Sequence, residues 1–431
     1  MAQRHHLIDA ARAAAVLMVI GYHAAFFRVG VTGGQVVLER WAPESSWWPA
    51  TWVLMLLPLF FVAGGYADAR SLDAAPPGPA GRARFWAARG RRISGPLTLF
   101  TLVVGGAASI LAWLPGAPPV TPYPGAGGGD WLTLMTLLSR DYCAFWWFLT
   151  VYLGLIVLAP LAVGLHDRFG AAVGVALCLA AAAVDAWASA SGNVDVRYVN
   201  WLLVWPACHQ WGVAYRRGAF TRGGAWRPMA ALVGGAGGVG ALIAWAGYPG
   251  SAIVSYYPPT VALALLALAQ AGLLGLLERA GALRTLPPAA ARALGRLSGA
   301  LMTVYLWETT AIVAASALLA WVGLRRPDAA SWLLHPALVT VAALALLLAA
   351  LPALAWAGDR LTPPRRDAPR PLLTLAALVA LTAGTALAWL QGLLLHPGRP
   401  WAGAAVVLTV AGALLLAVPG RGPLNREAAP R

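Results

Sequence analysis

Twelve long apolar stretches run along this 431-residue chain, and they constrain its fold more than any other feature. Each stretch is close to the ~20 residues that an α-helix needs to cross the hydrocarbon core of a bilayer. Charged residues make up 11% of the sequence, whereas they make up roughly a quarter of a soluble domain. We therefore predict an all-α integral membrane protein, a polytopic helical bundle with spanning helices near 7–27, 47–67, 93–114, 144–166, 170–191, 199–217, 229–248, 257–277, 298–322, 332–356, 371–395 and 401–419.

The distribution of positive charge predicts the orientation of this bundle. The net charge is +15, and all 31 basic residues are Arg. With the N-terminus in the cytoplasm, only seven Arg residues fall in external loops, as the positive-inside rule requires. This pattern predicts a multi-pass protein of the cell (plasma or inner) membrane with both termini inside and the lipid bilayer as partner. It argues against nucleic-acid binding, because the Arg residues do not gather in a soluble basic module.

A polar segment near the C-terminal end of the sequence indicates how the chain is divided. The segment 359–371 separates ten predicted spans from a final pair that carries almost no polar side chains. We predict a membrane core at 1–358, an accessory helix pair at 359–420 and a cytoplasmic tail at 421–431. Cys143, Cys178 and Cys208 lack the spacing of metal ligands, so we expect neither a metal site nor a disulfide.

The first apolar stretch carries an Arg and a His within the membrane. Arg12 and His23 are eleven residues apart, which on a helix places them on one face roughly 16 Å from each other. Ionisable side chains inside a bilayer are costly and indicate function by default. His23 could accept a proton from an alcohol, and Asp9 could hold the Arg12 guanidinium in an ion pair. The structural alternative has His23 bonded to a neighbouring helix and Arg12 snorkelling to the headgroups.

An Arg pair at the start of the third predicted span suits a phosphate-bearing ligand. Arg89 and Arg92 lie one turn apart on one helix face, and guanidinium binds phosphate in a bidentate fork. The alternative is topological, because any inner loop collects Arg.

The ninth predicted span carries Glu308 near its middle, close to Tyr305. A Glu facing lipid would be costly, so we expect this side chain to face the protein interior, either neutral or paired. We therefore take Glu308 as a candidate catalytic residue, together with His23 and Arg12. A helix–helix hydrogen bond without a catalytic part is the alternative for Glu308. The aromatic run around Trp147 could form a ligand wall, or it could be an interfacial anchor or core packing.

Combined in this order, these features resemble the membrane-bound acyltransferase 3 family of O-acyltransferases. The resemblance covers about residues 5–356 and leaves the last two helices unmatched. The matching residues are Asp9, Arg12 and His23 in a D-x-x-R-x10-H first helix, Phe60-Phe61-Val62 with Gly64, Gly65 and Tyr66, the pair Arg89 and Arg92 followed by Ile93 and Pro96, Trp147-Phe148-Leu149, and Tyr305-Leu306-Trp307.

The resemblance implies an enzyme that moves an acyl group, acetyl or another short chain, from acyl-CoA to a hydroxyl of a carbohydrate, lipid-linked or small-molecule acceptor. His23 would be the general base, and Arg12 would help to hold the donor or the developing charge. Arg89 and Arg92 would bind the phosphates of acyl-CoA, whereas Asp9, Tyr305 and Trp147 would contact substrate. Two residues depart from the family pattern: Glu308 stands where members often carry a His, and Gly64 stands where a Ser is usual.

A secondary transporter or flippase of a polar or glycolipid substrate is the alternative from another class. Twelve spans with both termini inside are also the plan of the major facilitator fold, in which Arg12, His23 and Glu308 would form a proton relay or a substrate site. The chain shows no symmetry between two six-helix halves, and its charged motifs lie mainly in the first three helices. These observations favour the acyltransferase.

Overall fold

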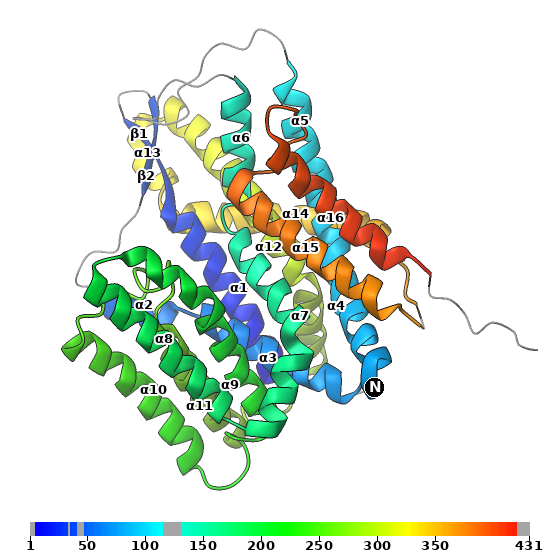
Figure 1. Cartoon of the computed structure of the whole chain (residues 1–431). Helices are drawn as coiled ribbons and strands as arrows, with labels where there is room; N and C mark the ends of the chain where they lie inside the picture. The colour runs from blue at the N-terminus through cyan, green and yellow to red at the C-terminus, as the bar shows by residue number, and fades with distance from the viewer. Residues whose placement is uncertain (1–4, 33–34, 41–46, 115–130, 367, 420–431) are drawn as a thin grey trace, which may run out of the picture.

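The computed structural model describes residues 5–32, 35–40, 47–114, 131–366 and 368–419. It is a bundle made almost entirely of helices (Figure 1), and eleven of its described helical segments are long and apolar enough to span a membrane. The predicted polytopic helical fold is therefore confirmed, while the predicted tail at 421–431 lies outside the described residues. The spanning segments are His6–Ala25, Trp48–Asp73, Gly78–Ala112, Trp146–Phe169, Ala172–Ser191, Trp226–Trp245, Val261–Arg279, Pro288–Arg325, Pro336–Leu361, Pro371–Gln391 and Pro400–Ala417.

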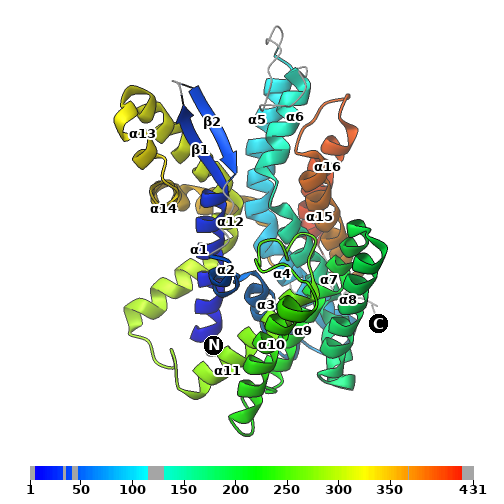
Figure 2. The same ribbon diagram turned by 90° about the vertical axis from the view of Figure 1, so that its left-hand side faces the viewer.

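Helix α1 (His6–Phe26) runs through the middle of the bundle, where it packs against α3 (Leu57–Asp73), α12 (Pro288–Arg325) and α14 (Pro336–Leu361). A two-stranded antiparallel hairpin follows it directly (Figure 2) and consists of β1 (Phe27–Thr32) and β2 (Gln35–Arg40). This hairpin is the exception to the all-α prediction. Its strand sequences contain four Val residues, and β-branched residues favour strands.

The second and third predicted spans are each built from more than one helix. Helix α2 (Trp48–Leu54) is separated from α3 by Met55 and Leu56, and Pro58 occupies the first turn of α3. Helix α4 (Gly78–Phe100), a π-helical turn (Thr101–Gly105) and α5 (Gly106–Ala112) form one long segment. Helix α6 (Trp131–Tyr142) packs beside α5 and leads into α7 (Trp146–Phe169).

The prediction of one continuous helix over 199–217 is wrong. The chain there forms a 3-10 helix (Val194–Leu202) followed by the short α9 (Val204–Arg216). Asn200 bonds to Asp185 of α8 (Ala172–Ser191), while Arg217, just after α9, pairs with Asp167 at the end of α7. The two short helices therefore run antiparallel to α8 together. A hydropathy window averages over such a break, so the sequence pattern did not reveal it.

The remaining helices complete the bundle around α1. Helices α10 (Trp226–Trp245) and α11 (Val261–Arg279) pack on each other, and α13 (Pro327–Leu333) links α12 to α14. The final pair, α15 (Pro371–Gln391) and α16 (Pro400–Ala417), packs against α4, and α15 also contacts α7. Leu378 and Leu381 of this pair are fully buried in the same hydrophobic cluster as α1 and α7. The accessory pair is thus packed closely against the predicted core.

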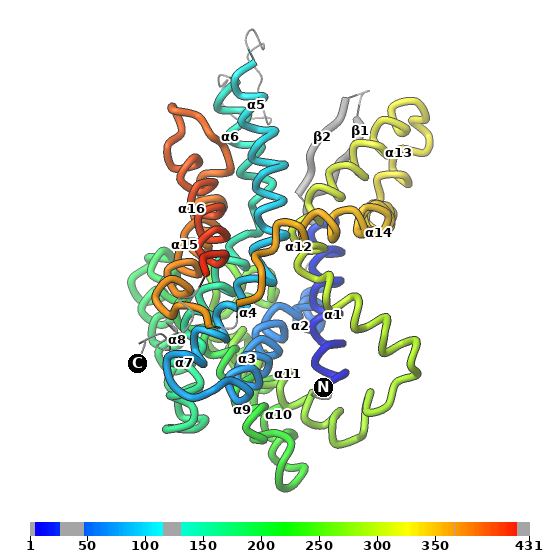
Figure 3. The backbone as a smooth tube through the Cα atoms, turned by 90° about the vertical axis from the view of Figure 1, so that its right-hand side faces the viewer, coloured from blue at the N-terminus to red at the C-terminus, as the bar shows by residue number. Residues whose placement is uncertain are grey.

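The two halves of α12 lie in different surroundings. None of residues 281–300 is buried, and Figure 3 shows the first turns of α12 standing away from the other helices. From Leu301 onward the helix is packed into the bundle, and Tyr305, Leu306 and Glu308 are all buried. The predicted span at 298–322 corresponds to this second half. The packed half places Glu308 opposite α1.

Helices α3 and α9 approach so closely that glycine is required at their crossing. A Cβ atom on Gly65 would lie 2.0 Å from the carbonyl oxygen of His209, and one on Gly212 would lie 1.9 Å from the carbonyl oxygen of Val62. Such a contact with backbone atoms can be relieved only by moving a helix. The crossing holds His209 of α9 beside Asp68 of α3.

We expect Gly65→Ala to lower the free energy of unfolding by about 1–3 kcal/mol, the usual cost of overpacking. Gly64→Ala is the matched control, because its Cβ would meet only the Tyr152 Cε2 atom at 3.8 Å, an ordinary contact. Thermal unfolding of both variants in detergent measures the difference. Equal melting temperatures would show that the crossing tolerates a wider separation than the structure has.

Candidate active site

A histidine and a glutamate that are 285 residues apart in the sequence form a buried pair. His23 lies near the end of α1, and its Nδ1 atom is 2.8 Å from Oε1 of Glu308 on α12. The His23 ring stacks on Phe145 with 3.3 Å between ring centroids, and Glu308 is 1% exposed. The structure thus brings together two residues that were predicted separately as catalytic. Both face the protein interior rather than lipid.

Three cavities follow one another along α1. The first, of about 290 Å³, is lined by His23, Tyr22 and Val16 on α1, and by Trp147 and Tyr256 from other segments. A narrow second cavity of about 60 Å³ begins at Val16 and ends at Arg12. The third, of about 260 Å³, is lined by Arg12, Asp9 and His5 together with residues of α3, α4 and α12. Neighbouring cavities share lining residues, so they form one interrupted path.

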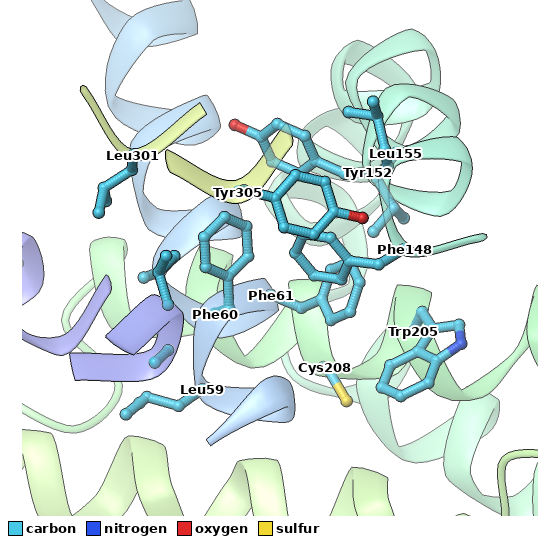
Figure 4. Close-up of a cluster of buried hydrophobic side chains, with 14 of the residues drawn as sticks. Leu59, Phe60, Phe61, Phe148, Tyr152, Leu155, Trp205, Cys208, Leu301 and Tyr305 are labelled. Atoms are coloured by element: carbon cyan, nitrogen blue, oxygen red, sulfur yellow. The ribbon is translucent and has the colours of Figure 1, made fainter. Parts of the chain in front are cut away.

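The neck between the first and second cavities is aromatic. Phe60, Phe148 and Tyr305 line both cavities, and Figure 4 shows these three rings gathered at one place. The Phe60 and Phe148 ring centroids are 4.9 Å apart, and those of Phe148 and Tyr305 are 5.4 Å apart. The Tyr305 hydroxyl donates a hydrogen bond of 2.6 Å to the carbonyl oxygen of Phe145. Tyr305, predicted to contact substrate, therefore lies where the first and second cavities meet, and its hydroxyl is hydrogen-bonded to the backbone.

The basic end of the path is formed by Arg12, Arg89 and Arg92, which all line both the second and the third cavity. Arg92 is exposed to the cavity and has no ion-pair partner among the described residues. The Nε atom of Arg12 is buried and has no hydrogen-bond partner in the described part of the chain, and its guanidinium lies 5.6 Å from the Phe60 ring centroid. These two cations are therefore available to an anionic ligand.

Arg89 differs from these two because it is already neutralised. Its Nη2 atom lies 2.8 Å from Oδ1 of Asp68 and donates a hydrogen bond of 3.1 Å to the hydroxyl of Ser71. The other oxygen of Asp68 is 3.2 Å from Nε2 of His209. All three ionisable side chains are buried. Breaking such a buried pair by removing one partner usually costs about 3–5 kcal/mol, so Asp68 holds Arg89 in place.

The ion pair predicted between Asp9 and Arg12 is not formed within 4.0 Å among the described residues. Both side chains instead line the third cavity, where Arg92 lies as well. Arg12 is also far from His23, because eleven helical residues span roughly 16 Å. Arg12 therefore belongs to the basic end of the path, and the structure does not bring it to the His23–Glu308 pair.

The pairing of Asp68 with Arg89 is the main feature that the sequence reasoning missed. A signal was present, because an Asp within an apolar helix needs a partner and Arg89 lies in the next one. The spacing along the chain does not say which of several Arg residues that partner is.

Two further polar side chains, Asp185 and Tyr256, have different roles. Asp185 accepts hydrogen bonds from the Tyr248 hydroxyl and the backbone N–H of Val261, both 2.9 Å long, and so it ties α8 to the start of α11. Tyr256 lines the first cavity from the segment that precedes α11, and burial raises the pKa of its hydroxyl. A tyrosine hydroxyl is protonated near neutral pH, so Tyr256 brings a hydrogen-bond donor to the lining of the cavity. Among the described residues, no group of three His, Cys, Asp or Glu side chains could hold a metal ion.

The multi-pass helical bundle places a buried His–Glu pair at one end of an interrupted path. At the other end lie two Arg side chains that have no ion-pair partner in the part of the chain that the structure describes, and this path is the candidate active site. The family model described as an acyltransferase domain matches residues 5–356, which is most of the chain. The protein belongs to the acyltransferase 3 family and is a membrane acyltransferase. Neither the search of curated proteins nor that of solved structures found a match. The family assignment favours acyl transfer over the transporter alternative.

Proposed function

We propose that this protein transfers an acyl group, acetyl in the simplest case, from acyl-CoA to a hydroxyl of a carbohydrate, lipid-linked or small-molecule acceptor in the cell membrane. The observation that carries the proposal is the His23–Glu308 pair, which faces a cavity joined through an aromatic neck to an Arg-lined cavity. A base at one end and a phosphate site at the other are what transfer from acyl-CoA to an alcohol requires.

The chemistry begins at the imidazole. With the Nδ1–H group of His23 donating a hydrogen bond to Glu308, Nε2 carries a lone pair and can accept the proton of the acceptor hydroxyl. The alcohol oxygen then attacks the thioester carbonyl carbon, a C–O bond forms, and the C–S bond to coenzyme A breaks. The imidazolium returns its proton to the departing thiolate, so the products are an ester and free coenzyme A. Glu308 stabilises the positive charge on the imidazolium while that proton is held.

The Arg cluster supplies the donor site in this proposal. Arg12 and Arg92 would bind the phosphates at the third cavity, and Arg89 would shape the site while paired with Asp68. The arm of the donor would pass through the second cavity and reach the neck at Phe60 and Tyr305. The 16 Å or so between Arg12 and His23 matches a donor that is anchored at one end and reacts at the other.

The proposal is tested by incubating membrane vesicles that contain the protein with radiolabelled acetyl-CoA. We expect the label to move into a lipid or small-molecule fraction, and the transfer to disappear when the membranes carry the empty vector. Release of free coenzyme A measured with a thiol reagent provides a second readout. Intact acetyl-CoA after long incubation with every acceptor fraction tested would contradict the proposal.

Replacing Arg92 with Ala should raise the KM for acyl-CoA roughly 10- to 100-fold, because a hydrogen bond to a charged group contributes about 1.5–3 kcal/mol. The kcat at saturating donor should change little, since a phosphate clamp acts as uniform binding. Arg82→Ala is the matched control, because Arg82 is exposed on the same helix and lines none of the three cavities in the described part of the chain. An unchanged KM for Arg92→Ala would show that Arg92 does not bind the donor and only contributes to the excess of Arg in the inner loops.

A further inference from the structure

The cavity that contains His23 is lined mostly by apolar side chains, among the residues whose side chains the structure describes. Among the described lining residues there is no Arg, Asp or Glu. Oxygen- or nitrogen-bearing side chains come from six residues, namely Tyr22, His23, Thr51, Trp147, Tyr256 and Tyr305. The others are aliphatic residues, Met, Phe and Gly from α1, the α2–α3 junction, the start of α7 and the segment before α11.

Much of the hydrogen-bonding capacity of these six residues is used within the protein. The Thr51 hydroxyl donates to the carbonyl oxygen of Trp48 at 2.6 Å and accepts from the N–H of Ala252 at 2.9 Å. The hydroxyl of Tyr305 is bonded to Phe145, and one nitrogen of His23 is bonded to Glu308. The indole N–H of Trp147 and the hydroxyl of Tyr256 remain the main donors that the described lining offers.

Most hydroxyl groups of a sugar would lack hydrogen-bond partners in such a cavity. Sugars carry a hydroxyl on most of their carbons, and a buried hydroxyl without a partner loses its hydration without replacement. An alcohol on an apolar body needs one polar contact, at the hydroxyl that reacts, and gains from burying the rest. The volume of about 290 Å³ is near the lower end of small-molecule pockets, roughly 300–1,000 Å³, and is far larger than an acetyl group.

We infer that the acceptor is an alcohol whose hydroxyl is carried on an apolar body, and that this body occupies the first cavity. The inference rests on the proposed acyl transfer and narrows its acceptor class. The hydroxyl points to Nε2 of His23, and the apolar body lies between α1 and the α2–α3 junction, where Met55 and Leu57 line the wall. The break in the helix at Met55 and Leu56 is held by a hydrogen bond of 2.8 Å from Gln270 to the carbonyl oxygen of Met55.

The test compares two acceptors with the purified protein in nanodiscs and radiolabelled acetyl-CoA as donor. Geraniol is the apolar alcohol, and methyl α-glucoside is the sugar. We expect kcat/KM for geraniol to exceed that for the glucoside by about 100-fold or more, because an apolar pocket discriminates about 10²-fold against a single added hydroxyl and the glucoside carries several. Equal rates, or a preference for the glucoside, would overturn the inference and leave acyl transfer established.

Three further outcomes separate the inference from the proposed function. Release of coenzyme A that depends on His23, with neither alcohol acylated, would overturn the inference and leave the donor chemistry standing. Absence of any such release would overturn the proposed function as well. Faster transfer of decanoyl than of acetyl to the glucoside would assign the cavity to the acyl chain of the donor and would also contradict the inference.

A pair of neighbouring substitutions tests the location of the acceptor. Ile253 lines the first cavity, whereas Val254 beside it is 60% exposed and does not line it. Ile253→Trp should lower kcat/KM for geraniol roughly 10-fold by filling the cavity, as one misfitting group in an apolar pocket does. Val254→Trp should leave it unchanged. The same effect from both variants would mean that the loop, and not the cavity, determines the change.

Discussion

Replacement of His23 by Ala should lower the kcat for acyl transfer roughly 10²- to 10⁴-fold, the range that a positioned general base contributes. The loss is expected because no other described side chain in the first cavity can accept a proton from an alcohol near neutral pH. The substitution removes one ring from a buried site without removing a helix, so the protein should still insert and accumulate. Transfer of label from acetyl-CoA, normalised to the amount of folded protein, measures the effect.

His23→Gln separates a base from a structural histidine. Gln keeps a hydrogen-bonding side chain of similar reach, but it cannot accept and carry a proton near neutral pH. We therefore expect His23→Gln to be as inactive as His23→Ala. His166 provides the matched control, because it is also buried and bonded to a side chain, Gln210 at 3.1 Å, yet it lines none of the three cavities among the described residues. His166→Gln should keep its activity, and an active His23→Gln enzyme would defeat the assignment of His23 as the base.

Replacement of Glu308 by Gln should lower kcat by about 10²-fold or more. In other enzymes, replacing the carboxylate that is hydrogen-bonded to Nδ1 of a catalytic His by an amide lowers kcat strongly. The Gln amide can donate to Nδ1 and so place the ring proton on Nε2, where the lone pair is needed. The KM for acyl-CoA should stay unchanged, since Glu308 lies beyond the neck from Arg92. A fall in kcat without a change in KM is a signature that a helix-packing role would not produce.

Ser316 supplies the control for this substitution. It is buried on the same helix as Glu308, it lines none of the three cavities in the described part of the chain, and its hydroxyl has no hydrogen-bond partner there. Ser316→Ala should therefore leave both kcat and KM as they are. If Glu308→Gln and Ser316→Ala have the same small effect, Glu308 packs two helices together and does not orient the imidazole.

The sequence predicted most of the fold because the cost of polar groups in lipid restricts what each segment can be. Eleven predicted spans have a spanning helical segment in the structure. The break before α9 and the hairpin after α1 were not predicted, since both depend on local backbone geometry that an average over hydropathy does not contain. The cost of a polar group in lipid also identified His23 and Glu308 individually as candidates. Their contact could not be predicted, because it depends on how α1 packs against α12.

The basic end of the site was predicted less well, for a related reason. Arg89 and Arg92 are equivalent in the sequence, one turn apart and both in an Arg-rich stretch. Only the crossing of α3 with its neighbours decides that Asp68 neutralises Arg89 and leaves Arg92 free. A pairwise ion contact between helices is a property of the tertiary structure, so no periodicity along one helix can indicate it.

The alignment of the whole site depends on how helices α1 and α12 pack against each other. Each contributes residues to the second cavity, α1 through Arg12 and α12 through Ser298, and they meet again at His23 and Glu308. Each residue of a helix rises about 1.5 Å along the axis. A shift of α1 by one residue relative to α12 would therefore open the 2.8 Å contact between His23 and Glu308 at one end and displace the Arg side chains at the other. Substitutions in the interface between α1 and α12 will therefore change the position of the base and of the donor site together, even where the substituted residue contacts neither of them.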